Sequence, residues 1–230
     1  MKAKIFLALS ILSLFFIANV AQAHQPRLVY KMVSTIETPF IISNPDISQA
    51  FYGRLKNSSA DYFKVTLNTE QSLYLGLLTP DNNEAASEVS AIVIKLNSPD
   101  SDIKMSLGGS DSVWEKYYED YAGDNYWQGP DTKKLLPAGD YLITISAKDN
   151  IGKYVLVVGQ TESFPFAEAM KTLYNLPDLK MGFFGTSFLT VFSGIIGKYL
   201  LYSLIGLVIM LTLIVWYFIR RHNKNKYGQR

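Results

Sequence analysis

Residues 49–79 read QAFYGRLKNSSADYFKVTLNTEQSLYLGLLT, and this stretch decides the fold class. It contains short runs rich in Val, Leu, Tyr, Phe and Thr, separated by turn-forming residues, which is the pattern of consecutive β-strands. In the middle run, Phe63, Val65 and Leu67 share one face, because alternate side chains of a strand point to the same side. Strands with one buried face predict an antiparallel β-sandwich.

The same pattern extends over most of the chain between Met32 and Gly159. Strands are predicted at 48–55, 61–68, 72–79, 89–97, 140–148 and 153–160. Segments rich in Asn, Asp, Gly and Pro predict turns at 57–59, 81–83, 137–139 and 149–152. The last two turns predict a hairpin that closes the domain.

The closing stretch, LPAGDYLITISAKDNIGKYVLVV at 136–158, carries Ala-Gly-x-Tyr and Gly-x-Tyr-x-Leu. Together with the Gly turn and Asp-Tyr-Phe strand of 49–79, it resembles the bacterial pre-peptidase C-terminal domain over roughly a third of the extracytoplasmic part. The resemblance implies a jelly-roll-like β-sandwich, a non-catalytic accessory module that is sometimes stabilised by calcium. This chain departs from that pattern, since no peptidase precedes the module and a membrane anchor follows it. The resemblance therefore supplies a fold but no functional residue.

An aromatic segment, VWEKYYEDYAGDNYWQGPD at 113–131, interrupts the strand pattern and holds six Trp or Tyr and five acidic residues. Ser112 and Glu115 have the spacing of a helix capping box. The residues with helical spacing after it are Trp114, Tyr117, Tyr118 and Tyr121. We predict a short helical insertion that ends near Gly123, followed by a loop over 124–131.

Both ends of the chain carry membrane signals. Residues 1–23 combine two lysines, an apolar run and Ala-Gln-Ala, which predicts a secretory signal peptide, with an uncleaved N-terminal anchor as the alternative. Residues 199–219 carry no charge, and 21 residues at about 1.5 Å each span the hydrocarbon core of a bilayer. The basic tail at 220–230 predicts a cytoplasmic C-terminus and an N-terminal domain outside the cytoplasm.

These signals divide the chain into a signal peptide, a β-sandwich domain at 24–160, a helical juxtamembrane stalk at 161–198, the transmembrane helix and the tail. Within the stalk, a helix capped by Ser163 is predicted to run to Asn175 and to stop at Pro177. The apolar, uncharged stretch 181–197 is predicted either to lie at the membrane surface or to lead into the span as a bent helix.

Charge and cysteine content exclude several classes of function. Fourteen of the 22 Lys and Arg residues and all 20 acidic residues lie within 24–180, so this part has a net charge of −6. A negative body argues against nucleic-acid binding. The chain has no cysteine, which excludes disulfides, thiol chemistry and Cys-ligated metals.

Catalysis is disfavoured because His24 and His222 are the two histidines, and His222 falls in the predicted cytoplasmic tail. A Ser-His-Asp or Cys-His arrangement therefore cannot form in the sandwich. A pair of carboxylates for glycoside cleavage stays open as a weak alternative, a hydrolase of unknown type. Cleavage after Ala23 would make His24 the mature N-terminus, whose amine and imidazole can chelate copper, with Met32 and Met105 as the available soft ligands. An ordinary mature N-terminus is the preferred interpretation, because no second extracytoplasmic His is available and nothing in the sequence places the two methionines together.

Apart from copper, calcium is the one metal for which the sequence suggests ligands, because several loops are rich in side-chain oxygens. The candidate ligands are Asp81, Asn83, Asp100 and Asp102, with Asp124, Asn125 and Asp131 as a further group. None of these loops has the spacing of an EF-hand, and turn-forming Asp and Asn explain them equally well.

The aromatic segment supplies the candidate binding site. Its candidate residues are Trp114, Tyr118, Tyr126, Trp127, Asp124 and Asp131. Large rings flanked by acids can stack on sugars or grip a partner protein. We expect the predicted helix to act mainly as a lid on the sandwich and the loop to be the site. The sequence predicts a single-pass protein of the cell membrane, the inner membrane in a Gram-negative cell, that binds another envelope protein. A calcium- or carbohydrate-binding module is the alternative.

Overall fold

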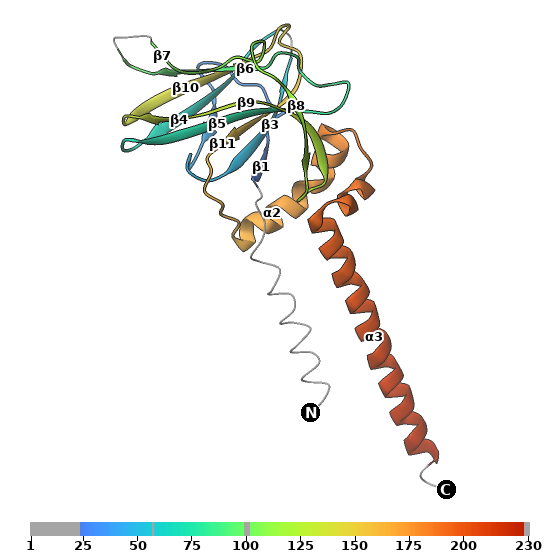
Figure 1. Ribbon diagram of the computed structural model, residues 1–230. Helices are drawn as coiled ribbons and strands as arrows, with labels where there is room; N and C mark the ends of the chain where they lie inside the picture. Colours follow the sequence, from blue (N-terminus) through green and yellow to red (C-terminus); the bar gives the residue numbers. More distant parts are fainter. Residues whose placement is uncertain (1–23, 57, 99–101, 228–230) are drawn as a thin grey trace.

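The computed structural model describes residues 24–56, 58–98 and 102–227 (Figure 1). The predicted signal peptide, Asp100 and the last residues of the tail lie outside the described residues. The described chain forms two β-sheets that pack against each other, followed by helical segments. The sheet orders are β1-β3-β11-β5-β9-β8 and β2-β4-β10-β6-β7, so the mainly β sandwich is confirmed.

The strands are short and close to the predicted ranges. The first sheet contains β1 (Gln25–Leu28), β3 (Gln49–Leu55), β11 (Gly152–Val158), β5 (Gln71–Pro80), β9 (Asp124–Leu136) and β8 (Glu115–Glu119). The second contains β2 (Phe40–Ile42), β4 (Asp61–Leu67), β10 (Gly139–Ser146), β6 (Ser90–Lys95) and β7 (Ile103–Leu107). All six predicted strands are present.

The core between the sheets is built from the predicted alternating positions. Phe63 and Val65 of β4 are fully buried, as are Tyr141 and Ile143 of β10. The hydroxyl of Tyr154 donates to the buried carboxylate of Asp61 at 2.7 Å. Gly53 lies under the same ring, since a Cβ there would come within 2.2 Å of Tyr154. The resemblance motif Gly-x-Tyr therefore places a buried, hydrogen-bonded tyrosine in the core.

Two predictions about strand pairing are wrong. The sheets are mixed rather than antiparallel, because β1 runs parallel to β3 and β2 runs parallel to β4. The closing hairpin does not form either: β10 pairs with β4 and β6, whereas β11 pairs with β3 and β5. The turn between β10 and β11 carries the chain from one sheet to the other. Alternation of apolar and polar residues within a strand does not indicate to which of the two sheets the strand belongs.

The predicted helix at 112–123 is also wrong, because the aromatic segment forms the antiparallel hairpin β8–β9. Tyr117 lies opposite Tyr126, and Lys116 lies opposite Trp127. The hydroxyl of Ser112 donates to the carbonyl of Gly108 and caps no helix. Aromatic residues favour strands, and pairing across a hairpin outweighs the helical spacing of four rings. The predicted loop at 124–131 belongs to β9.

The chain continues as α2 (Phe166–Pro177), a π-helical turn η2 (Asp178–Phe183), a 3-10 helix η3 (Phe188–Ser193) and α3 (Ile195–Tyr227). The predicted Ser163 cap is wrong: the N-cap is Pro165, and no side chain caps α2. The α-helix ends at Pro177, as predicted, but the chain continues as the π-helical turn η2. The coil widens after it, and the amide of Phe184 donates to the carbonyl of Leu179, five residues back.

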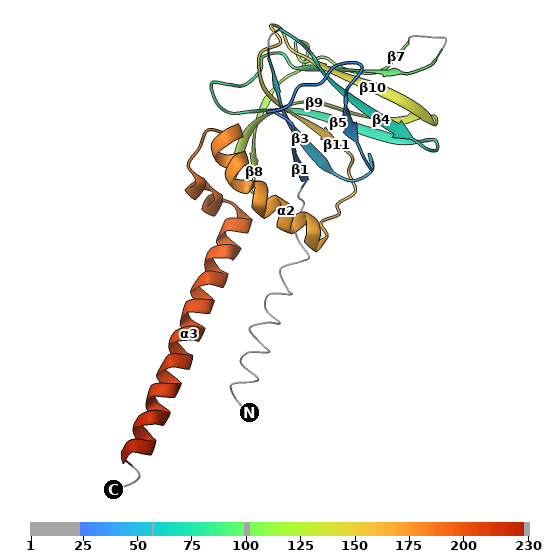
Figure 2. The same cartoon turned by 180° about the vertical axis from the view of Figure 1, so that it is seen from behind.

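The helix α3 extends alone from the domain (Figures 1 and 2). Its segment Gly197–Arg221 contains an 18-residue stretch with a mean hydropathy of 2.3, and no residue of that stretch is buried inside the protein. It is long and apolar enough to cross a membrane, and it contains the predicted span 199–219.

A second apolar core lies on the outer face of the first sheet. The residues that α2, η2 with its C-cap, and η3 contribute are Leu176, Leu179, Phe183, Phe184 and Val191. They pack on Tyr52, Val155 and Tyr126 of the sheet. All seven residues of β11 are consequently buried, since one face of the strand lines each core.

Candidate functional site

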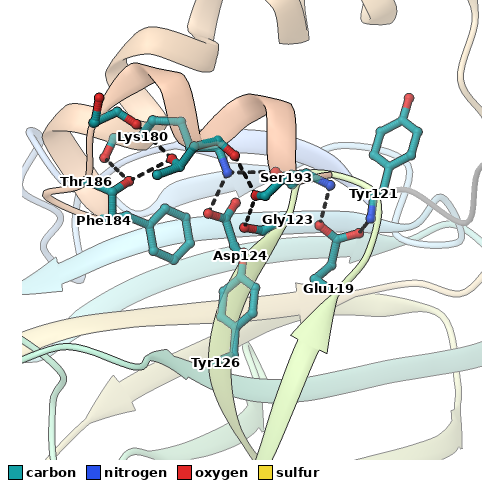
Figure 3. Close-up of polar contacts among 12 residues, drawn as sticks. Glu119, Tyr121, Gly123, Asp124, Tyr126, Lys180, Phe184, Thr186 and Ser193 are labelled. Carbon is teal, nitrogen blue, oxygen red and sulfur yellow. Dashed lines mark hydrogen bonds and ion pairs between the residues drawn. The ribbon is translucent and has the colours of Figure 1, made fainter. Parts of the chain in front are cut away.

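The β8–β9 hairpin lies at the edge of the first sheet, and β8 is its outermost strand. Glu119, at the end of β8, organises the hairpin turn. Its carboxylate accepts the amides of Tyr121 at 2.9 Å and Ala122 at 2.8 Å (Figure 3). Gly123 follows with a φ of +77°, a conformation that favours glycine. Burial raises the pKa of the Glu119 carboxyl, and the two amides oppose this shift.

A buried ion pair joins this hairpin to the C-terminal segment. The ammonium of Lys180 donates to the carboxylate of Asp124 at 2.6 Å and to the carbonyl of Ala122 at 2.7 Å (Figure 3). The exposed fractions of the two side chains are 0% and 4%. Desolvation raises the pKa of the Asp124 carboxyl, and Lys180 acts in the opposite direction. Asp124, a predicted ligand group, is thus occupied by the chain itself.

Tyr126 is the second predicted site residue that the chain covers. Its hydroxyl lies 3.1 Å from that of Tyr52, and its ring meets Phe184 edge-on at 5.4 Å. Phe183 packs against Tyr52 in the same way at 5.0 Å. Burial raises the pKa of Tyr126 strongly. These rings pack the hairpin and β3 against the C-terminal segment.

The start of α3 touches the hairpin turn directly. The amide of Ile195 donates to the carbonyl of Asp120 at 2.9 Å, and the Ser193 hydroxyl donates to the carbonyl of Gly123 at 3.3 Å. A Cβ on Gly194 would lie 2.5 Å from the backbone of Ala122. The close approach of two backbones therefore fixes the hairpin beside the first residue of α3.

A second lysine holds the same segment further along. Lys153 of β11 is 1% exposed, pairs with Glu84, and donates to the carbonyls of Phe183 and, at 3.3 Å, Gly182. Sequence reasoning missed both lysines and Tyr52. A signal for Lys180 does exist, because it is a lone charge within the apolar run of residues 179–184.

Trp114 is structural rather than accessible. Its indole donates to the carbonyl of Gly109 at 2.9 Å, and its ring covers Gly129, where a Cβ would meet it at 2.5 Å. The ring packs against the sandwich core. The expectation that Trp114 packs onto the sandwich is therefore confirmed, although it does so from the residue before β8 rather than from a helix.

Three predicted site residues stay accessible, and two of them belong to one surface. Tyr118 is 44% exposed on β8. Trp127 is half-buried on β9; its indole donates to Asp81 at 3.0 Å, and Lys116 lies over its ring at 5.0 Å. Asp131 lies further along β9, exposed, and accepts the hydroxyl of Tyr74 at 3.0 Å. We call Lys116, Tyr118 and Trp127 with the outer edge of β8 the hairpin edge.

The described calcium candidates, Asp81, Asn83 and Asp102, do not form a metal-binding group. Within the described ranges, no group of three or more His, Asp or Glu residues could hold a metal ion. Asp81 accepts from Trp127 and lies 3.2 Å from the ammonium of Lys116. Asp102 lies 3.9 Å from Lys104, and Asn83 follows Asp81 in the turn after β5.

The candidate copper ligands also lie in different parts of the fold. His24 lies at the outer face of the first sheet, where its imidazole contacts the hydroxyl of Ser48. Met105 packs in the core between the sheets, and Met32 is exposed. His24 instead borders a hollow of about 160 Å³, which Tyr74, Tyr117, Gln128 and Asp131 also line.

Comparison with known proteins finds distant structural likenesses alone. No protein-family model and no curated protein matches the chain. Among solved structures, it is similar to the pre-peptidase C-terminal domain of a collagenase from Bacillus anthracis, at 6% identity and a TM-score of 0.33, over 60% of this chain and 98% of that one. The periplasmic g-type lysozyme inhibitor PliG of Aeromonas hydrophila matches at 10% identity and a TM-score of 0.35, over 58% and 97%. The surface-associated copper-binding protein CorA of Methylomicrobium album BG8 matches at 8% and 0.29, over 54% and 98%.

The partial resemblance to the pre-peptidase C-terminal domain is thus found in the structure as well as in the sequence. At these identities and TM-scores the likeness concerns the β-sandwich alone. It covers little more than half of the chain, and no function follows from it.

Proposed function

We propose that this protein is a single-pass, membrane-anchored envelope protein whose non-catalytic β-sandwich binds another envelope protein through the hairpin edge. The observation that carries the proposal is the asymmetry of the hairpin. β9 pairs with β5 on one side and β8 on the other, whereas β8 is the last strand of the sheet.

An outermost strand presents backbone amides and carbonyls to solvent, and a partner strand can pair with them. Tyr118 and Trp127 add the aromatic surface that dominates many protein interfaces. The exposed side chains of Lys116 and Glu115 place charges of both signs on this edge. Such charges favour a partner with a complementary charge pattern over any partner that merely exposes apolar surface.

The contacts with the C-terminal segment support a partner that is itself at the membrane. Lys180 and Ile195 tie the hairpin turn to the start of α3, so the hairpin edge has a fixed position relative to that helix. With the basic tail in the cytoplasm, this edge lies outside the cytoplasm and close to the bilayer. In a Gram-negative cell this location is the periplasmic side of the inner membrane.

Site-specific photo-cross-linking tests the proposal. A photoreactive phenylalanine analogue replaces Tyr118 in the full-length protein in its native membrane, and the products are identified by mass spectrometry. The matched control is the same analogue at Ile41, which is 64% exposed on β2 of the other sheet. We expect one reproducible envelope protein at position 118 and not at 41. Identical product patterns at both positions would contradict the proposal.

A carbohydrate-binding module is the second candidate, and the hollow beside His24 favours it over calcium. Tyr74 and Tyr117 offer ring faces there, and Gln128 and Asp131 offer hydrogen-bonding groups. Titration calorimetry of the full-length protein with envelope oligosaccharides tests it. Binding that is lost in Tyr74→Ala and retained in Tyr118→Ala would support this candidate instead of the hairpin edge.

A further inference from the structure

The helix α2 has two apolar faces. One face, with Leu176, packs into the second core. The other is exposed and carries Phe166, Met170, Leu173 and Tyr174 at helical spacing, with exposed fractions of 81%, 50%, 38% and 86%. Scattered exposed apolar residues are ordinary, but a continuous stripe of four along a helix marks a surface that something covers.

Exposed apolar side chains also lie just before α3. In η3, which leads directly into α3, Phe188 and Phe192 are partly exposed and Leu189 is 69% exposed. In both views α2 lies on the side of the sandwich from which α3 leaves, and it runs across the direction of α3 (Figures 1 and 2). The face of α2 that points away from the sheet is therefore turned toward the end of the molecule that holds the membrane helix.

Charges near the stripe do not oppose contact with a lipid surface. Glu168 of α2 is paired with Arg27 at 2.8 Å, and Asp178 of η2 is paired with Lys31 at 2.7 Å. These are the acidic residues of both elements. Lys171 of α2 is exposed, and so is Lys31, which pairs with Asp178 of η2. Helices that lie in a membrane interface commonly carry such cations beside their apolar face.

We propose that the outer stripe of α2 (Phe166, Met170, Leu173, Tyr174) and the exposed rings of η3 insert into the interfacial region of the outer leaflet. This inference rests on the proposed membrane anchoring by α3. The occupant of the stripe is the lipid surface, because α2 lies on the side of the sandwich from which the membrane-crossing helix α3 leaves (Figures 1 and 2). Together α2, η3 and α3 hold the sandwich at one fixed tilt, and the hairpin edge faces sideways along the membrane rather than away from it.

Nitroxide spin labelling tests this directly, because the chain has no cysteine and each variant carries one label. Full-length Phe166→Cys and Met170→Cys are labelled in vesicles of phosphatidylethanolamine and phosphatidylglycerol. Collisions with oxygen, which concentrates in lipid, are compared with collisions with a water-soluble nickel chelate. Phe166 is 81% exposed, so its replacement removes no packing. Ile92→Cys, on the exposed face of β6, is the aqueous control, and Val208→Cys in α3 is the lipid control.

We expect the ratio of oxygen to nickel accessibility at 166 and 170 to exceed that at 92 and to approach that at 208. A ratio at both positions equal to that at 92 would overturn the proposal while leaving the anchor in place. Low accessibility to both reagents would mean that protein covers the stripe, a second copy or a partner, and would also overturn it. An aqueous ratio at 208 would instead show that the membrane anchoring itself has failed.

Discussion

The ammonium of Lys180 and the carboxylate of Asp124 lie 2.6 Å apart and are withdrawn from solvent where the aromatic hairpin meets the juxtamembrane segment. A buried pair of this kind is costly to break, because either partner left alone is an uncompensated charge. The pair therefore makes the position of the hairpin relative to α3 specific, where apolar packing alone would tolerate sliding.

Replacing Lys180 by methionine tests this role. Lys180→Met leaves Asp124 buried without its cation, and we expect a loss of about 3–5 kcal/mol in the free energy of unfolding. The double variant Asp124→Leu/Lys180→Met removes both charges and should recover most of that loss. Denaturant unfolding of the detergent-solubilised protein, followed by tryptophan fluorescence, gives the values.

The control is Lys171→Met, because Lys171 is exposed and lies 4.0 Å from Glu168. A surface pair is worth less than about 1 kcal/mol, so this variant should unfold nearly as the native protein does. Equal losses in Lys180→Met and in the double variant would show that the pair has no special part in holding the segment.

The contact between backbones at Gly194 gives a second prediction. An alanine there would place its Cβ 2.5 Å from the backbone of Ala122, so the hairpin turn must move away from α3. We expect Gly194→Ala to cost about 1–3 kcal/mol, as overpacking does. Hydrogen exchange at the amide of Ile195, which donates to Asp120, should also accelerate. Gly206→Ala is the matched control, because a Cβ there meets no atom within 4 Å. A similar response of both variants would argue against a tight contact at Gly194.

Acid should loosen the C-terminal segment. Hydrogen bonds from Lys153, Arg27 and Lys31 lower the pKa values of Glu84, Glu168 and Asp178 from ordinary values of 4.5, 4.5 and 3.8. A pKa that is lower in the folded state stabilises the protein above the ordinary value, and this stabilisation is lost as pH falls through the folded-state pKa. Buried Glu119, whose pKa is raised, acts in the opposite sense.

We therefore expect the melting temperature to fall as pH drops below about 4. Glu168→Gln should be less stable than the native protein at neutral pH and should lose less on acidification. Thermal melts of both proteins across this range provide the measurement. Parallel curves would show that the pair between Glu168 and Arg27 does not contribute to the acid response.

Calcium should have little effect on stability. Asp81, the best placed of the predicted ligands, already accepts from Trp127 and faces the ammonium of Lys116, which repels a cation. We expect added calcium chloride to leave the melting temperature unchanged. A rise that disappears in Asp81→Asn would restore the calcium-binding alternative.

The sandwich was predictable because each core strand, such as β4 with Phe63 and Val65, carries its burial pattern within a few residues. The aromatic hairpin was not, because rings spaced three and four apart fit a helix, and pairing of Tyr117 with Tyr126 depends on the distant sheet edge formed by β5. Asp124 and Tyr126 were predicted to bind a ligand or partner, whereas in the structure both are buried against other parts of the chain. Their partners Lys180 and Tyr52 lie 56 and 74 residues away, and no local pattern links them.

Affinity capture from native membranes tests the central claim most directly. The full-length protein is compared with Tyr118→Ala and Trp127→Ala, whose side chains lie outside both cores, and denaturant unfolding of each variant establishes that it is folded. The account predicts that the native protein retains one reproducible envelope partner and that both variants, still folded, lose it. Retention of the same partner by both folded variants, or membranes that yield no partner, would contradict the account.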